Sequence, residues 1–360
     1  MHFLLSSILC FALLPLDAPQ TELKVVKTFE PPSGSVFLAD PHFFDFSATG
    51  DLYVLDRNQS KVHRWSKEGK YLGHFAGEGN GPGELYSPRL IQASHGKIWV
   101  WSRNGKFSVF DEDGKWIRDF RGPAIQLRRF AVLNGHLLLV AYQRQEKAGE
   151  TFVYVRLMND KGKPGKVLKS IKNEMFLRPV EGEDGGRIKA YGPEVDITTN
   201  QQGDTWFGFS QEPTLYKVNS KGDIVETKTM TFKTGRITGQ EREDFEAIVF
   251  PGPDGKLFTL KDMPNLSISY DYDKSYYTHL YLKDNTLAAV LTPVSGNDQH
   301  KGYFIGSYYL YDFSSGDVKG RGSYRFNDDT LVLFVNGRAM KFSTGENGEF
   351  LIEEVALKSP

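Results

Sequence analysis

The amino-acid sequence predicts an all-β protein of four-stranded antiparallel sheets, and three observations support this fold class. Two apolar runs around a polar turn recur along the 360 residues. A second turn follows each copy at a similar distance, and strands such as residues 98–101 are apolar on both faces, as in sheets covered by neighbours on both sides. Together these observations predict a β-propeller, in which such sheets pack as blades around a central channel.

The first hairpin pattern is clearest in residues 44–56, where the turn between the apolar runs ends at Gly50. Further copies cover residues 90–101, 130–140, 195–209 and 280–291, and a sixth, shorter copy covers residues 327–334. Three of the spacings between successive turns lie near the roughly 40 to 50 residues of a propeller blade. The two longer spacings indicate insertions.

The second turn completes each unit. Its copies are residues 66–70, 111–115, 159–163, 219–223, 314–317 and 344–348. Two hairpins per unit make a four-stranded meander, so the sequence predicts a six-bladed β-propeller. A strand-like segment at residues 22–30 precedes the first unit, and the last unit contains only about three strands. We therefore expect the N-terminal strand to complete the final blade and close the ring.

Two segments interrupt the repeats. Residues 237–246 predict a short helix, because Thr238 is a good N-cap and Glu241 stands three positions later. Residues 251–258 predict one more hairpin turn. If that turn begins a separate unit, the ring has seven blades instead of six.

The units resemble NHL-type repeats. The loop over residues 77–85, GEGNGPGEL, is similar to a connection common in secreted bacterial six-bladed β-propeller proteins. The first two units match closely and the others by pattern. The resemblance implies the propeller fold and export, and it implies no defined activity. A dinucleotide-binding loop is disfavoured, because Pro82 stands where its third glycine belongs and no helix follows.

The N-terminal segment predicts export. Residues 3–16 are almost entirely apolar and precede a small residue, Ala18, so we expect a signal peptide over residues 1–18 and a single propeller domain over residues 21–358. The predicted location is secreted or periplasmic, without a membrane span in the mature chain. Cys10, the only cysteine, lies inside this segment after Leu9, which does not fit a lipoprotein box. A lipid anchor is therefore not expected.

Composition narrows the classes of partner. The chain is 39% hydrophobic and 25% charged, as in soluble globular proteins. Its 44 Lys and Arg residues balance 45 Asp and Glu residues, without a run of five like charges, so we expect neither nucleic acid nor a membrane surface as partner. Motifs for zinc proteases, serine hydrolases, phosphate-binding loops and calcium loops are absent from the sequence.

The candidate site follows from the predicted geometry. Loops that lead into the innermost strands of a propeller converge at the channel mouth. Counting back from each hairpin turn places six polar residues there: His42, Arg89, Arg128, Arg129, Glu194 and His279. These side chains could bind a small polar or anionic ligand, or could fill the channel with mutually paired charges.

Three functions remain open from sequence. The first is a binding or interaction module for an unknown ligand, which needs no cofactor. The second is a metal-dependent lactonase- or lyase-like enzyme, with calcium or zinc held by Glu194, His42 and His279. Arg89 and Arg128 disfavour this second function, because they would repel a cation. The third is a scaffold that holds another envelope protein.

Overall fold

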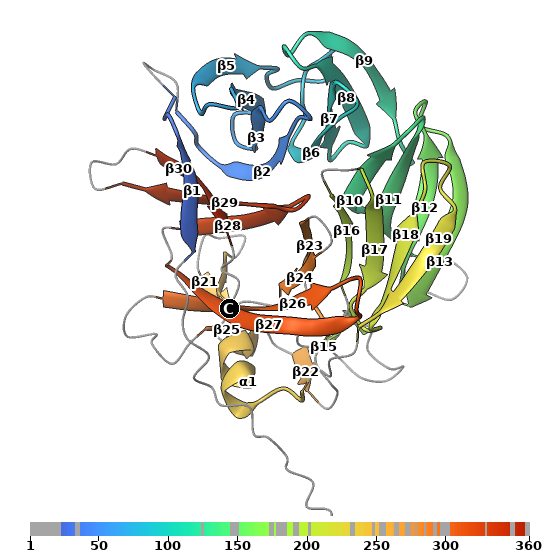
Figure 1. Cartoon of the computed structure of the whole chain (residues 1–360), viewed down its shortest axis with the longest axis vertical. Helices are drawn as coiled ribbons and strands as arrows, with labels where there is room; N and C mark the ends of the chain where they lie inside the picture. Colours follow the sequence, from blue (N-terminus) through green and yellow to red (C-terminus); the bar gives the residue numbers. More distant parts are fainter. Residues whose placement is uncertain are drawn as a thin grey trace, which may run out of the picture.

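Antiparallel strands dominate the described part of this computed structural model (Figure 1). The structure describes residues 23–32, 37–123, 126–144, 151–172, 176–177, 186–189, 194–200, 203–230, 235–246, 249–251, 257–262, 266–270, 275–277, 279–283, 286–290, 294–295, 303–327, 330–345 and 350–356. The expected signal peptide and Cys10 lie outside these residues. No helix within them is long and apolar enough to cross a bilayer.

Five sheets are four-stranded antiparallel blades. The first contains β2 (Pro41–Phe46), β3 (Leu52–Asp56), β4 (Lys61–Trp65) and β5 (Tyr71–Phe75), and the second contains β6 (Pro88–Ser94), β7 (Lys97–Ser102), β8 (Lys106–Asp111) and β9 (Trp116–Arg121). The third contains β10 (Gln126–Leu133), β11 (His136–Arg144), β12 (Thr151–Asn159) and β13 (Pro164–Lys172), and the fourth contains β16 (Val195–Thr199), β17 (Thr205–Phe209), β18 (Thr214–Val218) and β19 (Ile224–Thr229). The last contains β28 (Thr330–Val335), β29 (Arg338–Thr344), β30 (Phe350–Ala356) and β1 (Lys24–Phe29).

The N-terminal strand closes the ring, as predicted. β1 pairs with β30 along its length, from Lys24 opposite Ala356 to Phe29 opposite Ile352. Figure 1 shows the two strands side by side although they come from opposite ends of the sequence. Closure gives β30 a partner on both sides, so β1 becomes the outer edge strand of this blade.

One sheet departs from the blade pattern. β23 (His279–Lys283), β24 (Thr286–Val290), β25 (Val294–Ser295), β26 (Tyr303–Asp312) and β27 (Asp317–Asn327) form a five-stranded sheet. It lies between the fourth and last blades, because β23 contacts both β16 and β28. β25 occurs in the insertion after β24 and pairs with β26 beside β24. The structure thus has five four-stranded blades, and the predicted counts of six and seven are wrong.

The long insertions form structure outside the blades. The hairpin predicted at residues 251–258 is present as β20 (Val249–Pro251) and β21 (Leu257–Thr259), but it forms an isolated two-stranded sheet and starts no blade. A second small sheet joins β14 (Phe176–Leu177), β15 (Gly186–Lys189) and β22 (Leu266–Ser269), with β15 and β22 parallel, and η1 covers Leu260–Asp262. The sequence patterns gave no sign of this parallel pair.

The predicted helix is α1 (Gly239–Glu246). Thr238 and Glu241 form the expected capping box: the Glu241 N–H donates to Thr238 Oγ1 over 3.2 Å, and the Thr238 N–H donates to Glu241 Oε2 over 2.8 Å. Each side chain satisfies an N–H group that a helix start leaves unpaired.

The last hairpin differs from its prediction. β27 ends at Asn327. β28 forms a hairpin with the strand after it, β29, and not with the strand before it, β27. The turn between β28 and β29 is Asn336–Gly337, with φ of 45° and 74°. An Asn-Gly pair is the preferred two-residue hairpin turn because both residues tolerate positive φ. The predicted hairpin over residues 327–334 is therefore wrong.

In three of the blades the second turn is held by its first side chain, Asp111, Asn159 or Asn219. Asn159 Oδ1 accepts the N–H groups of Lys161 and Lys163, and Asp111 Oδ1 accepts those of Asp113 and Lys115. Such Asx turns explain why Asp or Asn recurs there.

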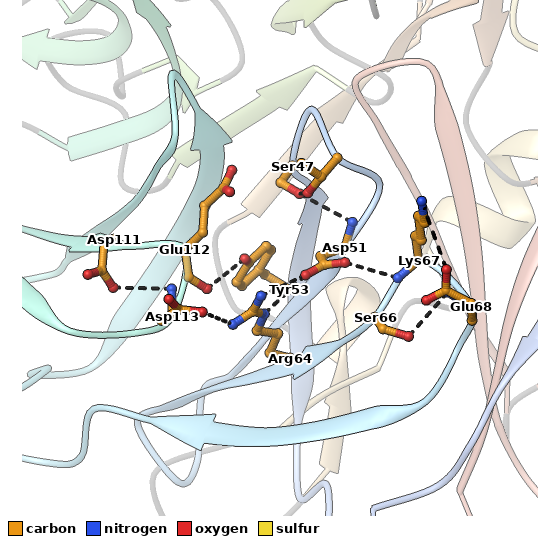
Figure 2. Close-up of polar contacts among 11 residues, drawn as sticks. Ser47, Asp51, Tyr53, Arg64, Ser66, Lys67, Glu68, Asp111, Glu112 and Asp113 are labelled. Atoms are coloured by element: carbon orange, nitrogen blue, oxygen red, sulfur yellow. Dashed lines mark hydrogen bonds and ion pairs between the residues drawn. The ribbon is translucent and has the colours of Figure 1, made fainter.

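These turns also connect neighbouring blades. Arg64 of the first blade bonds both Asp51 and Asp113, and the Tyr53 hydroxyl donates to the Glu112 carbonyl of the second blade (Figure 2). Arg118 of the second blade bonds Asp160 of the third in a similar way.

The core lies between the blades. All residues of β3 are buried, which agrees with the predicted burial of strands on both faces. A close backbone approach occurs at Gly208 in β17, where an added Cβ would overlap the Tyr277 hydroxyl and lie 2.6 Å from Leu215 Cδ2. The Tyr277 hydroxyl is buried and has no hydrogen-bond partner among the described residues.

Gly208→Ala should destabilise the protein by about 1–3 kcal/mol, because the new methyl group has no room. Urea unfolding monitored by tryptophan fluorescence measures the change. Gly77→Ala is the matched control, since a Cβ there meets nothing within 4 Å. Tyr277→Phe in the Gly208→Ala background should recover part of the loss. Equal stability of Gly208→Ala and the unsubstituted protein would contradict this packing.

Candidate functional site

The first strands of the sheets form the inner wall of the ring. Neighbouring ones contact each other in the order β2, β6, β10, β16, β23, β28 and back to β2. An innermost strand has no further strand on its inner side, so its backbone groups there need other partners.

Side chains from neighbouring strands supply these partners. The Ala93 N–H donates to Asp45 Oδ2 over 2.9 Å, and the Val132 N–H donates to buried Gln92 Oε1 over 2.8 Å. Asp45 lies on β2 and Gln92 on β6, so each acceptor serves the next strand around the ring. Asp196 on β16 does the same for β23 through the Leu280 N–H.

Three innermost strands carry a β-bulge near the start of the strand. The register shifts between Pro41 and Phe43, between Pro88 and Leu90, and between Leu127 and Arg129. The skipped residues are His42, Arg89 and Arg128, which therefore occupy equivalent positions in three blades. A bulge re-aims the side chain of its extra residue. We call this end of the ring the bulge end.

Arg129 contacts three other innermost strands at the bulge end. Its Nε lies 3.1 Å from Asp196 Oδ1 on β16, and its Nη2 lies 3.4 Å from His279 Nδ1 on β23. Its guanidinium carbon lies 4.6 Å from the ring centre of Phe43 on β2. Since Arg129 belongs to β10, one side chain joins four strands across the ring.

Asp196 is the acidic partner of Arg129, and sequence reasoning missed it. Its carboxylate is 6% exposed and lies 3.6 Å from His279 Nδ1. Burial acts to raise the pKa of Asp196, but the Arg129 guanidinium, His279 and the Leu280 N–H together hold it below its ordinary value. The available signal was a charged residue between two apolar residues of a buried strand, a position that requires a partner.

Asn336 crosses the ring at the opposite end. Its Nδ2 donates to Asp45 Oδ2 over 3.1 Å, and its Oδ1 accepts the Thr199 N–H over 3.2 Å. Asp45 lies on β2 and Thr199 on β16, and these strands are not neighbours in the ring. Burial raises the pKa of Asp45 to about 6.

Three arginines of the bulge end are paired with carboxylates. Arg57 Nε lies 2.5 Å from Asp40 Oδ2, and Arg128 Nη2 lies 3.5 Å from Glu194 Oε2. Arg129 is paired with Asp196. Of the predicted site residues, Arg128 and Glu194 meet each other, and Arg129 meets His279.

Two further arginines make no ion pair with any described residue: Arg89, which was predicted, and Arg103, which was not. The Arg103 N–H donates to the Ser87 carbonyl, and Ser102 pairs with Pro88, so Arg103, which follows the end of β7, lies beside the start of β6, where Arg89 stands. Burial, then Arg103 and Arg57, lower the pKa of Arg89 against the opposing effect of Asp40. The Arg89 Nε is buried and finds no hydrogen-bond partner within the described ranges.

His42 lies in the same cationic surroundings. Burial, then Arg57, Arg89 and Arg129, lower its pKa to about 4 against the opposing effect of Asp40. His42 is therefore neutral at pH 7.

The surroundings oppose the cation site considered from sequence. His42 faces three arginines, Glu194 is paired with Arg128, and His279 contacts Arg129. In the described part of the chain, no group of three or more His, Cys, Asp and Glu side chains is arranged to hold a metal ion. The nearby guanidinium charges would repel calcium or zinc.

Comparisons with known proteins show the fold. No family model matches the chain, and no curated protein matches it. A "Putative exported protein" from Bacteroides fragilis is similar in structure, with a TM-score of 0.58, 11% identity, and coverage of 94% of this chain and 96% of the other. A member of the DUF4221 family from Bacteroides vulgatus gives a TM-score of 0.54 and 12% identity, with coverage of 94% and 99%. At these identities the likeness shows the β-propeller fold alone.

Arg129→Gln should destabilise the protein at pH 7 by on the order of 3 kcal/mol, because it leaves the Asp196 carboxylate buried without its strongest partner. The pKa of Asp196 is lowered on folding, so its ionised form stabilises the protein above pH of about 4, and this contribution is lost as the pH falls through the lowered pKa. The difference in the free energy of unfolding between Arg129→Gln and the parent protein should therefore become smaller in acid.

Urea unfolding at pH 7 and at pH 3.5 measures this difference. Arg129→Gln with Asp196→Asn is the matched control, since it removes both charges and should recover part of the loss at pH 7. A variant as stable as the parent at pH 7 would show that the pair does not hold the ring together.

Proposed function

We propose that this chain is an exported β-propeller module that binds a small anionic ligand at the bulge end of the ring. The observation that carries the proposal is the pair of arginines, Arg89 and Arg103, that have no carboxylate partner among the described residues. Guanidinium groups are the side chains best suited to bind carboxylate and phosphate groups.

The charge pattern favours a binding site over structural filling. If the polar residues only filled the ring, each cation would be expected to have an anion beside it. Arg57, Arg128 and Arg129 meet this expectation, and Arg89 and Arg103 do not. The lowered pKa of Arg89 reflects burial and repulsion by Arg103 and Arg57, and a bound anion would relieve that repulsion.

Asn336 supports a site with one accessible end. Its bonds to Asp45 and Thr199 place a side chain across the ring away from the bulges. We therefore expect a ligand to reach the arginines from the bulge end. Export is supported by the apolar segment at residues 3–16 followed by Ala18, a signal-peptide pattern.

An anion that binds the folded protein should raise its melting temperature, and Arg89→Gln should remove most of this rise. Binding stabilises by about 2.7 kcal/mol when the ligand concentration is 100 times Kd. Differential scanning fluorimetry at pH 7 and constant ionic strength, with small carboxylates, phosphates and sulfate, measures the shift.

Lys161→Gln is the matched control for this measurement. Lys161 is exposed in the turn at residues 159–163, away from the bulge end, and removing its charge changes the net charge by the same amount. An equal response of Arg89→Gln and the unsubstituted protein, or an equal loss in Lys161→Gln, would refute binding at the bulge end.

A further inference from the structure

We propose that the bulge end selects a doubly charged oxyanion, the chemistry of a phosphomonoester, a sulfate or a dicarboxylate, which lies between Arg89 and Arg103. This inference rests on the proposed function, because it specifies the ligand class of the same site. It specifies the charge and the shape of the ligand, and the proposed function requires neither.

The pairing of charges supplies the first argument. Arg57, Arg128 and Arg129 have carboxylate partners at the bulge end. Arg89 and Arg103 make no ion pair with any described residue, and the carboxylate of Asp56 at this end accepts the Ala39 and Gln59 N–H groups. A dianion matches the two guanidinium charges of Arg89 and Arg103, whereas a monoanion leaves one of them without a counter-charge.

The second argument comes from the backbone, because Arg89 and Arg103 both belong to one pair of neighbouring strands, β6 and β7, or to the loop that follows it. Arg89 is the bulged residue next to Pro88, and Arg103 follows Ser102, which is paired with Pro88. The Arg103 N–H bond to the Ser87 carbonyl fixes the turn on this strand end. The two side chains thus start from neighbouring positions on one pair of hydrogen-bonded strands.

The donor geometry supplies the third argument. The Arg89 Nε is buried and lacks a partner among the described residues, so the inner edge of its guanidinium has an unused donor. Nε and a terminal nitrogen form a planar fork that matches two oxygens of one oxyanion. A lysine keeps the charge but cannot form this fork, and a halide offers one acceptor atom in place of the two oxygens that the fork matches.

Isothermal titration calorimetry of the purified full chain at pH 7.5 tests the class, with sulfate, methyl phosphate, succinate, acetate and chloride at one ionic strength. The expected result is at least a tenfold smaller Kd for the matching dianion than for acetate, and no binding of chloride. The preferred dianion identifies the source: sulfate or methyl phosphate indicates a tetrahedral group, and succinate indicates a dicarboxylate.

The pH dependence separates charge from shape. A phosphomonoester loses its second charge near pH 6, so methyl phosphate should bind more weakly at pH 5 than at pH 7.5. Sulfate keeps both charges over this range and should not weaken. Equal affinity of methyl phosphate at both pH values would overturn selection by double charge.

Two substitutions locate the site. Arg89→Lys should raise Kd for the dianion by about tenfold or more through loss of the fork, and Arg103→Gln should reduce the dianion preference toward that of a monoanion. Lys161→Gln, in an exposed turn away from the bulge end, should leave Kd unchanged, and thermal unfolding checks that each variant is folded.

The failures of the two proposals are distinguishable. If no anion binds the unsubstituted protein, the proposed function fails. If acetate binds as tightly as the dianions and Arg89→Gln abolishes both, the proposed function stands and the dianion inference fails. If Arg89→Lys binds the dianion as tightly as the parent, the fork is refuted.

Discussion

The inner edge of the ring is the constraint on which the rest of this structure depends. Innermost strands have N–H groups that no further strand can accept, and Asp45, Gln92 and Asp196 accept them from the next strand around the ring. Placing a carboxylate such as Asp196 in this buried wall requires a cation beside it, and Arg129 meets that requirement. The need of backbone N–H groups for hydrogen-bond partners thus leads directly to the charged network at the bulge end.

Sequence reasoning succeeded where the signal is local. The turns at residues 111–115 and 159–163 repeat because one Asp or Asn side chain closes each of them, and the capping box of α1 spans only Thr238 to Glu241. It failed where an insertion between the repeats determines which strands form a sheet. The strand β25 joins a blade-like sheet through an insertion with no repeat of its own, so turn counting misjudged the number of blades.

The candidate site shows the same division. Turn spacing located His42, Arg89 and Arg128, since a fixed distance from the hairpin turn leads to the bulges. It missed Asp196, whose contacts join strands distant in sequence, and Arg103, which lies beside Arg89. The whole chain has a net charge of −1, which does not reveal that Arg89 and Arg103 lack an ion-pair partner among the described residues, because pairing depends on positions in space.

Pairing of β1 with β30 also imposes an order of events on folding. Lys24 leaves the ribosome among the first residues of the domain, and its partner Ala356 is among the last to be made. Until then β1 has no strand to pair with, and the blades that form earlier are not yet closed into a ring. The ring can close only after Ala356 has been made, so the slow, long-range contact comes last and joins segments more than 300 residues apart.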